Sequence, residues 1–163
     1  MPRREASGSR ALVGVISDTH GLVRPAALAA LRGVTHILHA GDVGDAGVLE
    51  ALRALAPVTA VRGNVDGGTW ALTLPETSLV TLGGARIFLL HDQHRLRFDP
   101  AFDEIDAVVA GHTHLPRNDV RDGVLLFNPG SAGPRRFDRP VTVGLLHITG
   151  GRIAGKIVRL RVR

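Results

Sequence analysis

Short apolar runs separated by polar turns follow one another along the first third of the chain. Three of them have the pattern of buried strands: Ala11–Ile16, Thr35–His39 and Val58–Val61. Between them, Pro25–Leu31 and Asp45–Leu55 predict helices, the first with proline in its opening turn and the second with aspartate as N-cap. This βαβαβ order over residues 11–62 predicts a parallel sheet with right-handed crossovers.

The second half of the chain is rich in strands joined by short turns. Two glycine pairs, Gly83-Gly84 and Gly150-Gly151, stand between apolar segments as hairpin turns do. The segments that they would join are Ser78–Leu82 with Arg86–Leu90, and Val141–Thr149 with Ile153–Val162. Two further strand-like runs are Ala107–Ala110 and Val124–Phe127. We therefore predict an α/β protein: a four-layer α/β/β/α sandwich of two mixed β-sheets flanked by helices. Residues 11–163 would form a single domain after a disordered tail of residues 1–10.

The amino-acid composition limits the kinds of functional site that the chain can form. The 163-residue chain has no cysteine, which excludes disulfides, thiolate zinc sites and cysteine nucleophiles. The formal net charge is +5, and Lys156 is the only lysine, so the positive charge is almost all arginine. Five Phe and one Trp are too few for a platform that stacks nucleic-acid bases. Neither a secretory signal nor an apolar run long enough for a membrane span is present, so we expect a cytoplasmic protein.

Seven potential metal ligands follow predicted strands: Asp18, His20, Asp42, Asn64, His91, His112 and His114. The carboxyl ends of parallel strands are where open α/β sheets bind ligands, so we expect these side chains to meet at one edge. Asp18 and His20, like His112 and His114, are i, i+2 pairs, and such pairs point to one side of extended backbone. The donor set suits manganese, iron, zinc, cobalt, nickel or magnesium rather than copper(I).

Seven side chains exceed the needs of one four-coordinate ion and fit two divalent ions that share Asp42. With Asp18, Asp42 and a bridging hydroxide counted, such a centre keeps one positive charge, which attracts a phosphodiester. Two ions about 3.5–4 Å apart lower the pKa of a bridging water and hold phosphoryl oxygens during in-line attack.

These residues lie within a series of motifs: Ser17-Asp18-Thr19-His20-Gly21, Gly41-Asp42, Gly63-Asn64-Val65-Asp66, His91 and Gly111-His112-Thr113-His114. The series resembles the calcineurin-like metallophosphoesterases, above all their compact bacterial and archaeal phosphodiesterase branch, which also contains the retromer scaffold subunit. The resemblance runs from about residue 12 to 150, and Asn128-Pro129-Gly130-Ser131 with Arg135 resembles the branch's late signature. It implies a first metal on Asp18, His20, Asp42 and His114, and a second on Asp42, Asn64, His91 and His112.

The chain departs from the family pattern at two places. Larger members of the superfamily have a histidine general acid after the ligand asparagine, whereas Val65 stands here and cannot transfer a proton. The branch usually has glycine after the equivalent of His91, followed by another histidine, whereas this chain has Asp92, Gln93 and His94. Asp92 adds charge beside the site. His94 is either the missing histidine displaced by one position or a surface residue.

Four further residues are candidates for supporting roles. We expect His39 to orient Asp42, Asp66 to orient the Asn64 loop, and Asn128 to act either beside the ligands or in a turn before Pro129. Arg135 is a candidate contact for substrate phosphate, with a solvated loop charge as the alternative.

The sequence therefore predicts a phosphodiesterase that uses a metal-bridging hydroxide, with Asp42, Asn64 and His94 as catalytic candidates and two divalent ions, manganese first, as cofactors. A small phosphodiester is the expected partner, without a membrane. An arginine-driven nucleic-acid binder is a weaker idea, and a homo-oligomer is left open. The main alternative is a catalytically weak scaffold module of the same fold, for which Val65 and Asp92 are the discriminating features.

Overall fold

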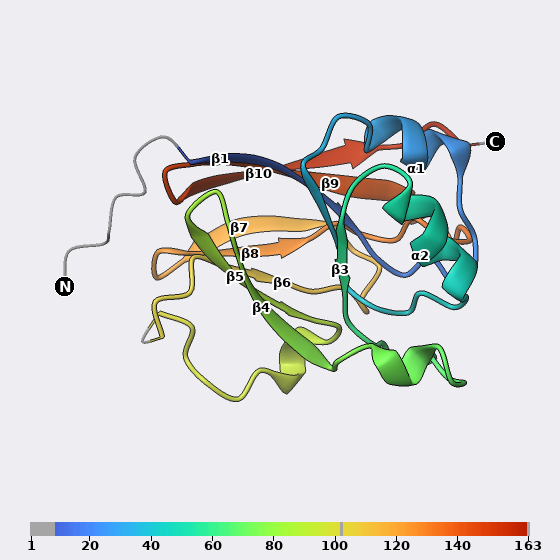
Figure 1. Cartoon of the computed structure of the whole chain (residues 1–163), viewed down its shortest axis with the longest axis horizontal. Coiled ribbons are helices and arrows are strands. Elements are labelled where there is room, and N and C mark those ends of the chain that lie inside the picture. Colours follow the sequence, from blue (N-terminus) through green and yellow to red (C-terminus); the bar gives the residue numbers. More distant parts are fainter. Residues whose placement is uncertain (1–8, 102, 163) are drawn as a thin grey trace.

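The computed structural model describes residues 9–101 and 103–162, and in these residues ten strands form two stacked sheets of five (Figure 1). The first sheet contains, in spatial order, β10 (Arg152–Arg159), β9 (Thr142–Thr149), β1 (Arg10–Ile16), β2 (His36–His39) and β3 (Val58–Ala60). The second contains β4 (Thr77–Leu82), β5 (Ala85–Leu90), β6 (Ala107–Val109), β8 (Val124–Asn128) and β7 (Arg117–Arg121). The predicted α/β sandwich of two mixed sheets is confirmed.

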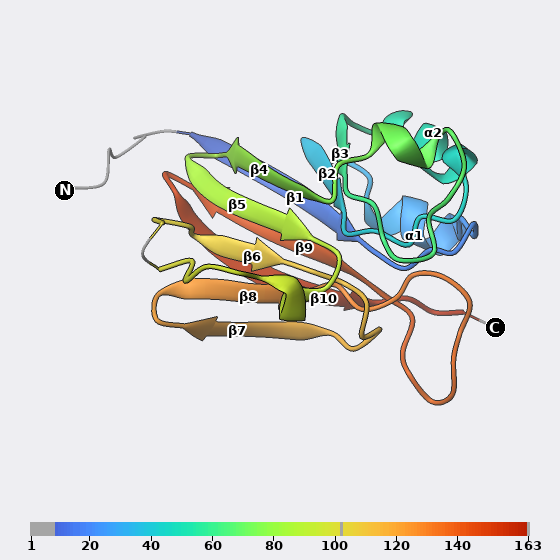
Figure 2. The same ribbon diagram turned by 90° about the horizontal axis from the view of Figure 1, so that it is seen from below.

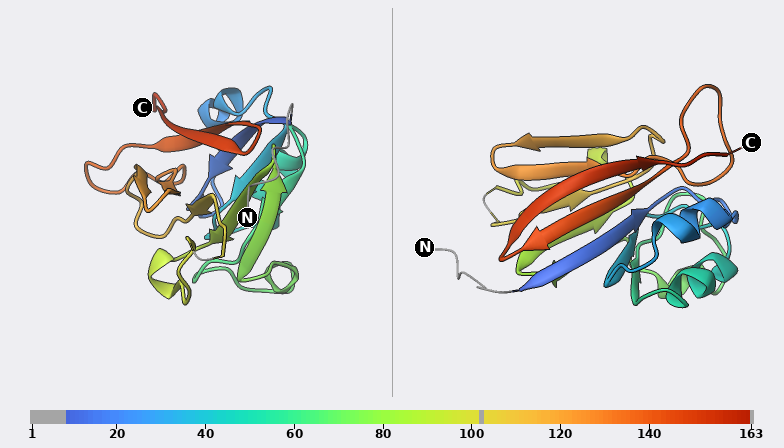
Figure 3. Two further views of the ribbon diagram at one scale, coloured as in Figure 1. Left: turned by 90° about the vertical axis from the view of Figure 1, so that its left-hand side faces the viewer. Right: turned by 90° about the horizontal axis from the view of Figure 1, so that it is seen from above.

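The parallel half of the first sheet is built from the predicted βαβαβ unit. Strands β1, β2 and β3 are parallel neighbours, and α1 (Pro25–Ala30) and α2 (Ala46–Arg53) connect them. The Asp45 side chain accepts a hydrogen bond from the Gly47 amide at 2.8 Å, as expected of an N-cap. Both helices pack on the sheet face that points away from the second sheet (Figure 3).

In the described residues, the outer face of the second sheet is covered by a loop segment rather than by α-helices. Apolar side chains such as Val108 and Leu126 lie there against Leu96 and Ile105, which come from the segment between β5 and β6. That segment contains the short 3-10 turn η2 (Gln93–Arg95), where the predicted fourth layer would have an α-helix. Another 3-10 turn, η1 (Ala71–Thr73), precedes β4.

The two sheets pack through a continuous apolar layer. Val15 and Leu38 of the first sheet meet Ile87, Leu89 and Phe127 of the second, and all are almost fully buried. Each such side chain contributes about 1.5–3 kcal/mol relative to its exposed state. This layer fixes the distance between the sheets, and therefore between residues carried by different sheets.

The parallel strands of both sheets end at the same edge of the sandwich, as Figure 2 shows for β1, β5 and β6. Segments 17–21, 40–44 and 61–66 leave the first sheet there, and segments 91–92 and 110–114 leave the second. The fold therefore brings together the loops on which the sequence placed its candidate ligands.

Some boundaries differ from the expectations. Strand β7 was not predicted, Arg10 already belongs to β1, and β10 ends at Arg159 rather than at Val162. Residues 1–8 of the predicted tail lie outside the described residues. Among the residues that the structure describes, no helix has the length and apolar character needed to cross a membrane.

Candidate metal centre

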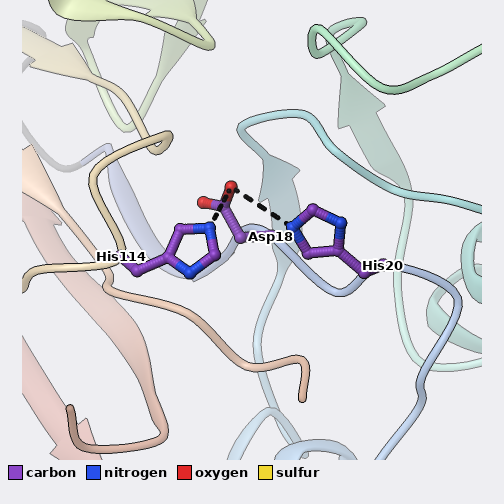
Figure 4. Close-up of side chains that lie close together, drawn as sticks. All are labelled: Asp18, His20 and His114. Carbon is purple, nitrogen blue, oxygen red and sulfur yellow. Dashed lines mark ion pairs between the residues drawn. The ribbon is translucent and has the colours of Figure 1, made fainter. Parts of the chain in front are cut away.

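Asp18 is the buried centre of one group of ligands. Its carboxylate is 0% exposed, and its Oδ1 lies 3.2 Å from His114 Nε2 and 4.0 Å from His20 Nε2 (Figure 4). Asp18 Oδ1 and His20 Nε2 are buried atoms with no hydrogen-bond partner among the described residues. Burying such atoms unpaired costs free energy, which a cation placed between them would offset. The two residues and His114 therefore form a donor set that fits a metal ion.

A second group surrounds Asp42. Its Oδ2 lies 3.2 Å from His91 Nε2 and 3.8 Å from His20 Nε2, while the Asn64 Oδ1 atom lies 2.9 Å from His91 Nε2. His91 Nε2 is also 4.0 Å from Asp18 Oδ1, so the two groups adjoin. Ligand atoms of Asp18, Asp42 and His91 all lie within 4.8 Å of one another. Two carboxylates thus occupy the middle of the centre.

The orientation of His91 follows from its hydrogen bonds. Its Nδ1 lies 2.7 Å from the Ala40 carbonyl, which can only accept, so Nδ1 carries the proton and donates it. Nε2 is then the atom that faces Asp42 and Asn64. Burial lowers the pKa of His91, but the hydrogen bonds to Asp42 and Ala40 and the two aspartate charges outweigh burial and raise it.

The surroundings of Asp42 and His114 favour the forms that bind metal. Burial raises the pKa of Asp42, but the His91 hydrogen bond and the Val65 amide outweigh it and lower the pKa. Burial lowers the pKa of His114, the Asp18 charge opposes this, and the Arg136 charge adds to the lowering. An ionised carboxylate and a neutral imidazole are the ligand forms that divalent ions require.

His112 lies at the margin of the centre. Its side chain is 42% exposed, and its ring stands edge-on to His91 with 5.1 Å between centroids. The His112 amide donates to Asp18 Oδ2 at 3.1 Å, and its Nε2 lies 3.9 Å from Asp92 Oδ2. The structure therefore gathers Asp18, His20, Asp42, Asn64, His91 and His114 into contact, and places His112 against the solvent side of His91.

The backbone at the ligands is left-handed rather than extended. Positive φ angles occur at Asp18 (55°), His20 (47°), Asp42 (53°), His112 (71°) and His114 (62°). The two i, i+2 pairs therefore do not point together through extended backbone, and that reasoning was wrong for both. Each tight turn re-aims the side chain, at a cost of about 1–3 kcal/mol per residue that surrounding contacts must offset.

One of those contacts comes from Asp66. Its carboxylate accepts hydrogen bonds from three backbone amides: Gly63 at 2.8 Å, Gly44 at 2.9 Å and Val43 at 3.2 Å. These bonds join the loop after β3 to the loop after β2. Asp66 thus bonds to both loops, which is what an orienting role would need, and that role stays a prediction.

His39 lies fully buried behind two ligand loops. Thr19 donates its hydroxyl proton to the Val43 carbonyl at 2.9 Å, so its oxygen accepts from His39 Nε2 at 3.0 Å. His39 Nδ1 accepts from the Gly41 amide at 3.1 Å. Both ring nitrogens are therefore occupied, and burial lowers the pKa of His39 to about 4. His39 therefore bonds to Thr19 and Gly41, and among the described residues it makes no hydrogen bond to Asp42, so its part in orienting that ligand stays a prediction.

Asn128 makes hydrogen bonds of both kinds that its two alternative roles require. Its Oδ1 accepts from the Gly130 amide at 2.9 Å, which makes the expected turn. Its Nδ2 donates to the Gly111 carbonyl at 2.9 Å and lies 3.1 Å from Thr113 Oγ1. Asn128 therefore fixes the loop that carries His112 and His114.

Two serines were missed as supporting residues. Ser17 Oγ donates to Asp18 Oδ2 at 2.7 Å, and Ser131 Oγ donates to the Asp18 carbonyl at 3.1 Å. Both serines stood inside the quoted motifs, so their position beside a ligand was the available signal. The bond from Ser17 leaves Asp18 Oδ1 as the oxygen that faces His20 and His114.

Two candidates lie apart from the gathered ligands. His94 is exposed in η2, and its backbone amide donates to Asp92 Oδ1 at 3.0 Å. Arg135 lines a surface hollow with Arg159 and Arg161. Their parts in proton transfer and phosphate binding stay predictions.

Aspartate and histidine side chains gather where the parallel strands of two stacked mixed sheets end. This arrangement defines the class of metal-dependent hydrolases built on an α/β sandwich. The chain belongs to the calcineurin-like phosphoesterase superfamily, whose domain model matches residues 12–151. It is therefore a hydrolase that acts on phosphoric ester bonds.

Three relatives illustrate the range of this family. A "probable metallophosphoesterase" of Methanothermobacter thermautotrophicus is 34% identical over 160 residues, which cover 91% of this chain and 92% of that one. The phosphoesterase Yfce of E. coli has a similar structure, with a TM-score of 0.65 and 26% identity over 92% of this chain and all of its own. Vps29 of Entamoeba histolytica, in a complex with Zn²⁺, has a TM-score of 0.69 and 25% identity over 91% of this chain and 98% of its own.

Proposed function

We propose that the chain is a dinuclear metal-dependent phosphodiesterase. The observation that carries the proposal is the pair of buried, unpartnered atoms, Asp18 Oδ1 and His20 Nε2, beside a second carboxylate. One ion would be held by Asp18, His20, Asp42 and His114, and the other by Asp42, Asn64, His91 and His112. The names of the relatives support the reaction, since Yfce is called a phosphodiesterase.

The donor set determines which ions are suitable. Carboxylate, amide and imidazole donors favour borderline divalent ions, so manganese is the proposed metal, with iron, zinc, nickel, cobalt and magnesium as alternatives. Two bound ions would supply a water of lowered pKa as the nucleophile and positive charge for the phosphoryl oxygens.

The residues of the chain orient this chemistry. The Val65 amide donates to Asp42 Oδ1 at 3.0 Å, which leaves Oδ2 to face His91 and His20. Ala40 holds the His91 ring so that Nε2 points inward. Val65 cannot protonate the leaving oxygen, so the proposal assigns that proton to His94, which is exposed on the segment that carries His91.

Turnover of bis(p-nitrophenyl) phosphate tests the proposal. Metal-free protein should be inactive, and added Mn²⁺ should restore activity. Asp42→Asn should lose at least one metal ion together with activity. Asp45→Asn is the matched control, because Asp45 caps α2 and asparagine also caps helices. Equal activity of metal-free protein, Asp42→Asn and the untreated parent would exclude this mechanism.

A second candidate is a scaffold module of the same fold. The likeness to Vps29 and the apolar Val65 side chain, 54% exposed beside Asn64, favour it. Full metal occupancy without hydrolysis of diesters or monoesters, and stable copurification with a partner, would select this candidate. For the enzyme, the proposed ligand is a small phosphodiester rather than nucleic acid or a membrane, and the proposed location is the cytoplasm.

A further inference from the structure

A hollow of about 660 Å³ opens beside the metal centre, and the sequence motifs supply only one side of it. Asn64, His91 and His112 form one side of it, so it begins at the proposed second metal. Its volume lies within the range of small-molecule sites, about 300–1,000 Å³. A substrate whose scissile phosphate sits on the metals would extend into this space.

Three arginines line the hollow: Arg62, Arg95 and Arg97. Arg62 is paired, because its Nη2 lies 3.2 Å from Glu76 Oε1. Arg97 Nη1 donates to the His94 carbonyl at 3.3 Å. Among residues 9–101 and 103–162, no carboxylate lies within ion-pair distance of Arg95 or Arg97. Like charges gathered in a cleft raise the local positive potential and attract anions.

Two carboxylates, Glu76 and Asp92, also line the hollow. Glu76 pairs with Arg62, and Asp92 does not cancel the charge of the other two arginines. Asp92 Oδ1 accepts from the His94 amide as the cap of η2, and its Oδ2 faces His112 at 3.9 Å. The carboxylate of Asp92 therefore faces the candidate ligand His112 rather than Arg95 or Arg97. The unpaired positive charge belongs to Arg95 and Arg97, which follow His91 on the same short segment.

That segment is held in place at both ends. Arg117 Nη1 of β7 donates to Gln93 Oε1 at 3.1 Å, and the ring of Phe98 stands edge-on to Phe88 of β5 with 4.9 Å between centroids. Leu96 packs on the outer face of the second sheet. Guanidinium groups placed on such a fixed segment suit phosphate, since arginine presents several donors in a rigid plane.

We propose that Arg95 and Arg97 bind a second phosphate of the substrate, so that the hollow selects phosphodiesters with a further phosphate near the scissile one. This rests on the proposed function for the position of the scissile phosphate. The chemical class is a diester with a terminal phosphate, rather than a diester with two neutral groups.

Binding of two products tests the hollow independently of turnover. Thymidine 3′,5′-bisphosphate and thymidine 5′-monophosphate are titrated by calorimetry into the Mn²⁺-loaded full chain at low salt. The bisphosphate should bind about tenfold tighter, as charge-assisted hydrogen bonds to a phosphate predict. The preference should shrink at high salt, because partly exposed charges are screened.

Arginine variants show which side chains cause the preference for the bisphosphate. Arg95→Gln/Arg97→Gln should remove the preference while the monophosphate binds as before, and Arg95→Lys/Arg97→Lys should retain part of it. Arg10→Gln/Arg152→Gln, the charge-matched control, should keep the full preference, since both residues pair with Thr149 at the opposite end of the first sheet. Equal affinity for the two nucleotides in the parent, or an unchanged preference in the double glutamine variant, would overturn the proposal.

Turnover separates this proposal from the proposed function. The substrates are thymidine 5′-(p-nitrophenyl phosphate) with and without a 3′-phosphate. Hydrolysis of both with equal kcat/KM would reject the second phosphate site and leave the phosphodiesterase standing. A bisphosphate binding preference without any hydrolysis would support the anion site and reject the phosphodiesterase.

Discussion

His91 Nδ1 donates a hydrogen bond to the Ala40 carbonyl across 2.7 Å, and this bond joins the two sheets at the metal centre. His91 follows β5 of the second sheet, whereas Ala40 follows β2 of the first. The same ring then directs Nε2 to Asp42 Oδ2 at 3.2 Å. The geometry of the centre therefore depends on how the sheets pack.

Metal binding should stabilise the fold, because it satisfies Asp18 Oδ1 and His20 Nε2. At a free Mn²⁺ concentration of about 100 times the Kd, the gain is about 2.7 kcal/mol, which corresponds to a Tm rise of roughly 5–10 °C for a chain of this size. Thermal unfolding with EDTA and with Mn²⁺ measures it. Asp18→Asn should lose most of the shift, and equal Tm values for the parent under both conditions would contradict a metal at this site.

His39 should make stability depend on pH. Its pKa is lowered to about 4 in the folded chain, whereas an unfolded histidine titrates near pH 6.5. Below pH 6.5 His39 binds a proton in the unfolded chain but stays neutral in the folded chain. The free energy of unfolding therefore falls as pH decreases from 6.5 to 4. The fall due to His39 is about 3 kcal/mol.

Urea unfolding of metal-free protein between pH 4 and pH 7 measures this dependence. In His39→Gln the slope in that window should become smaller, because glutamine does not titrate. His36→Gln is the comparison variant: burial also lowers the pKa of His36, but this residue is only half-buried and bonds Thr59 away from the ligand loops, so its slope should decrease less than that of His39→Gln. Identical slopes in the parent and in His39→Gln would contradict the prediction.

Asp66 should contribute more to stability than an ordinary helix cap. Asp66→Ala removes the acceptor of three backbone amides and leaves two of them, Val43 and Gly63, unpaired at partly buried positions, so we expect a loss of about 2–3 kcal/mol. Asp45→Ala removes the acceptor of one amide and should cost about 1 kcal/mol. Chemical denaturation compares the two. An Asp66→Ala loss no larger than that of Asp45→Ala would show that the loop does not need this carboxylate.

Gly63 should not tolerate a side chain. A Cβ there would lie 2.2 Å from both the amide nitrogen and the Oδ1 of Asp42, so alanine must displace the shared ligand. Gly63→Ala should lower metal content and reduce stability by about 1–3 kcal/mol. At Gly67 a Cβ meets nothing within 4 Å, so Gly67→Ala should be neutral or slightly stabilising. Elemental analysis and denaturation of both variants check this pair, and full metal content in Gly63→Ala would contradict it.

Apolar periodicity was sufficient to predict the sheets, but not every strand in them. Strand β7 has the sequence Arg117-Asn118-Asp119-Val120-Arg121, and it is an edge strand with exposed side chains, so no apolar pattern marks it. The segment that packs on the outer face of the second sheet could not be predicted either, because Leu96 and Ile105 lie in a stretch without helical periodicity.

Strand ends and ligand types together predicted which residues meet at the centre. They could not predict how the side chains are aimed, because left-handed turns at Asp18 and Asp42 depend on contacts distant in sequence. The bonds made by Ser131 and Asp66 supply such contacts. Arg95 and Arg97 were missed because their neighbours in the hollow, such as Arg62 and Asn64, come from another part of the chain.

The division of the ligands between the two sheets has a consequence for biogenesis. Asp18, His20, Asp42 and Asn64 are made early, whereas His91, His112 and His114 are made later. A nascent chain that has not yet reached His91 holds only part of the donor set and has no partner sheet to bury it. The complete donor set for both proposed ions therefore exists only after the second sheet has been translated, which makes the assembled centre a late product of synthesis.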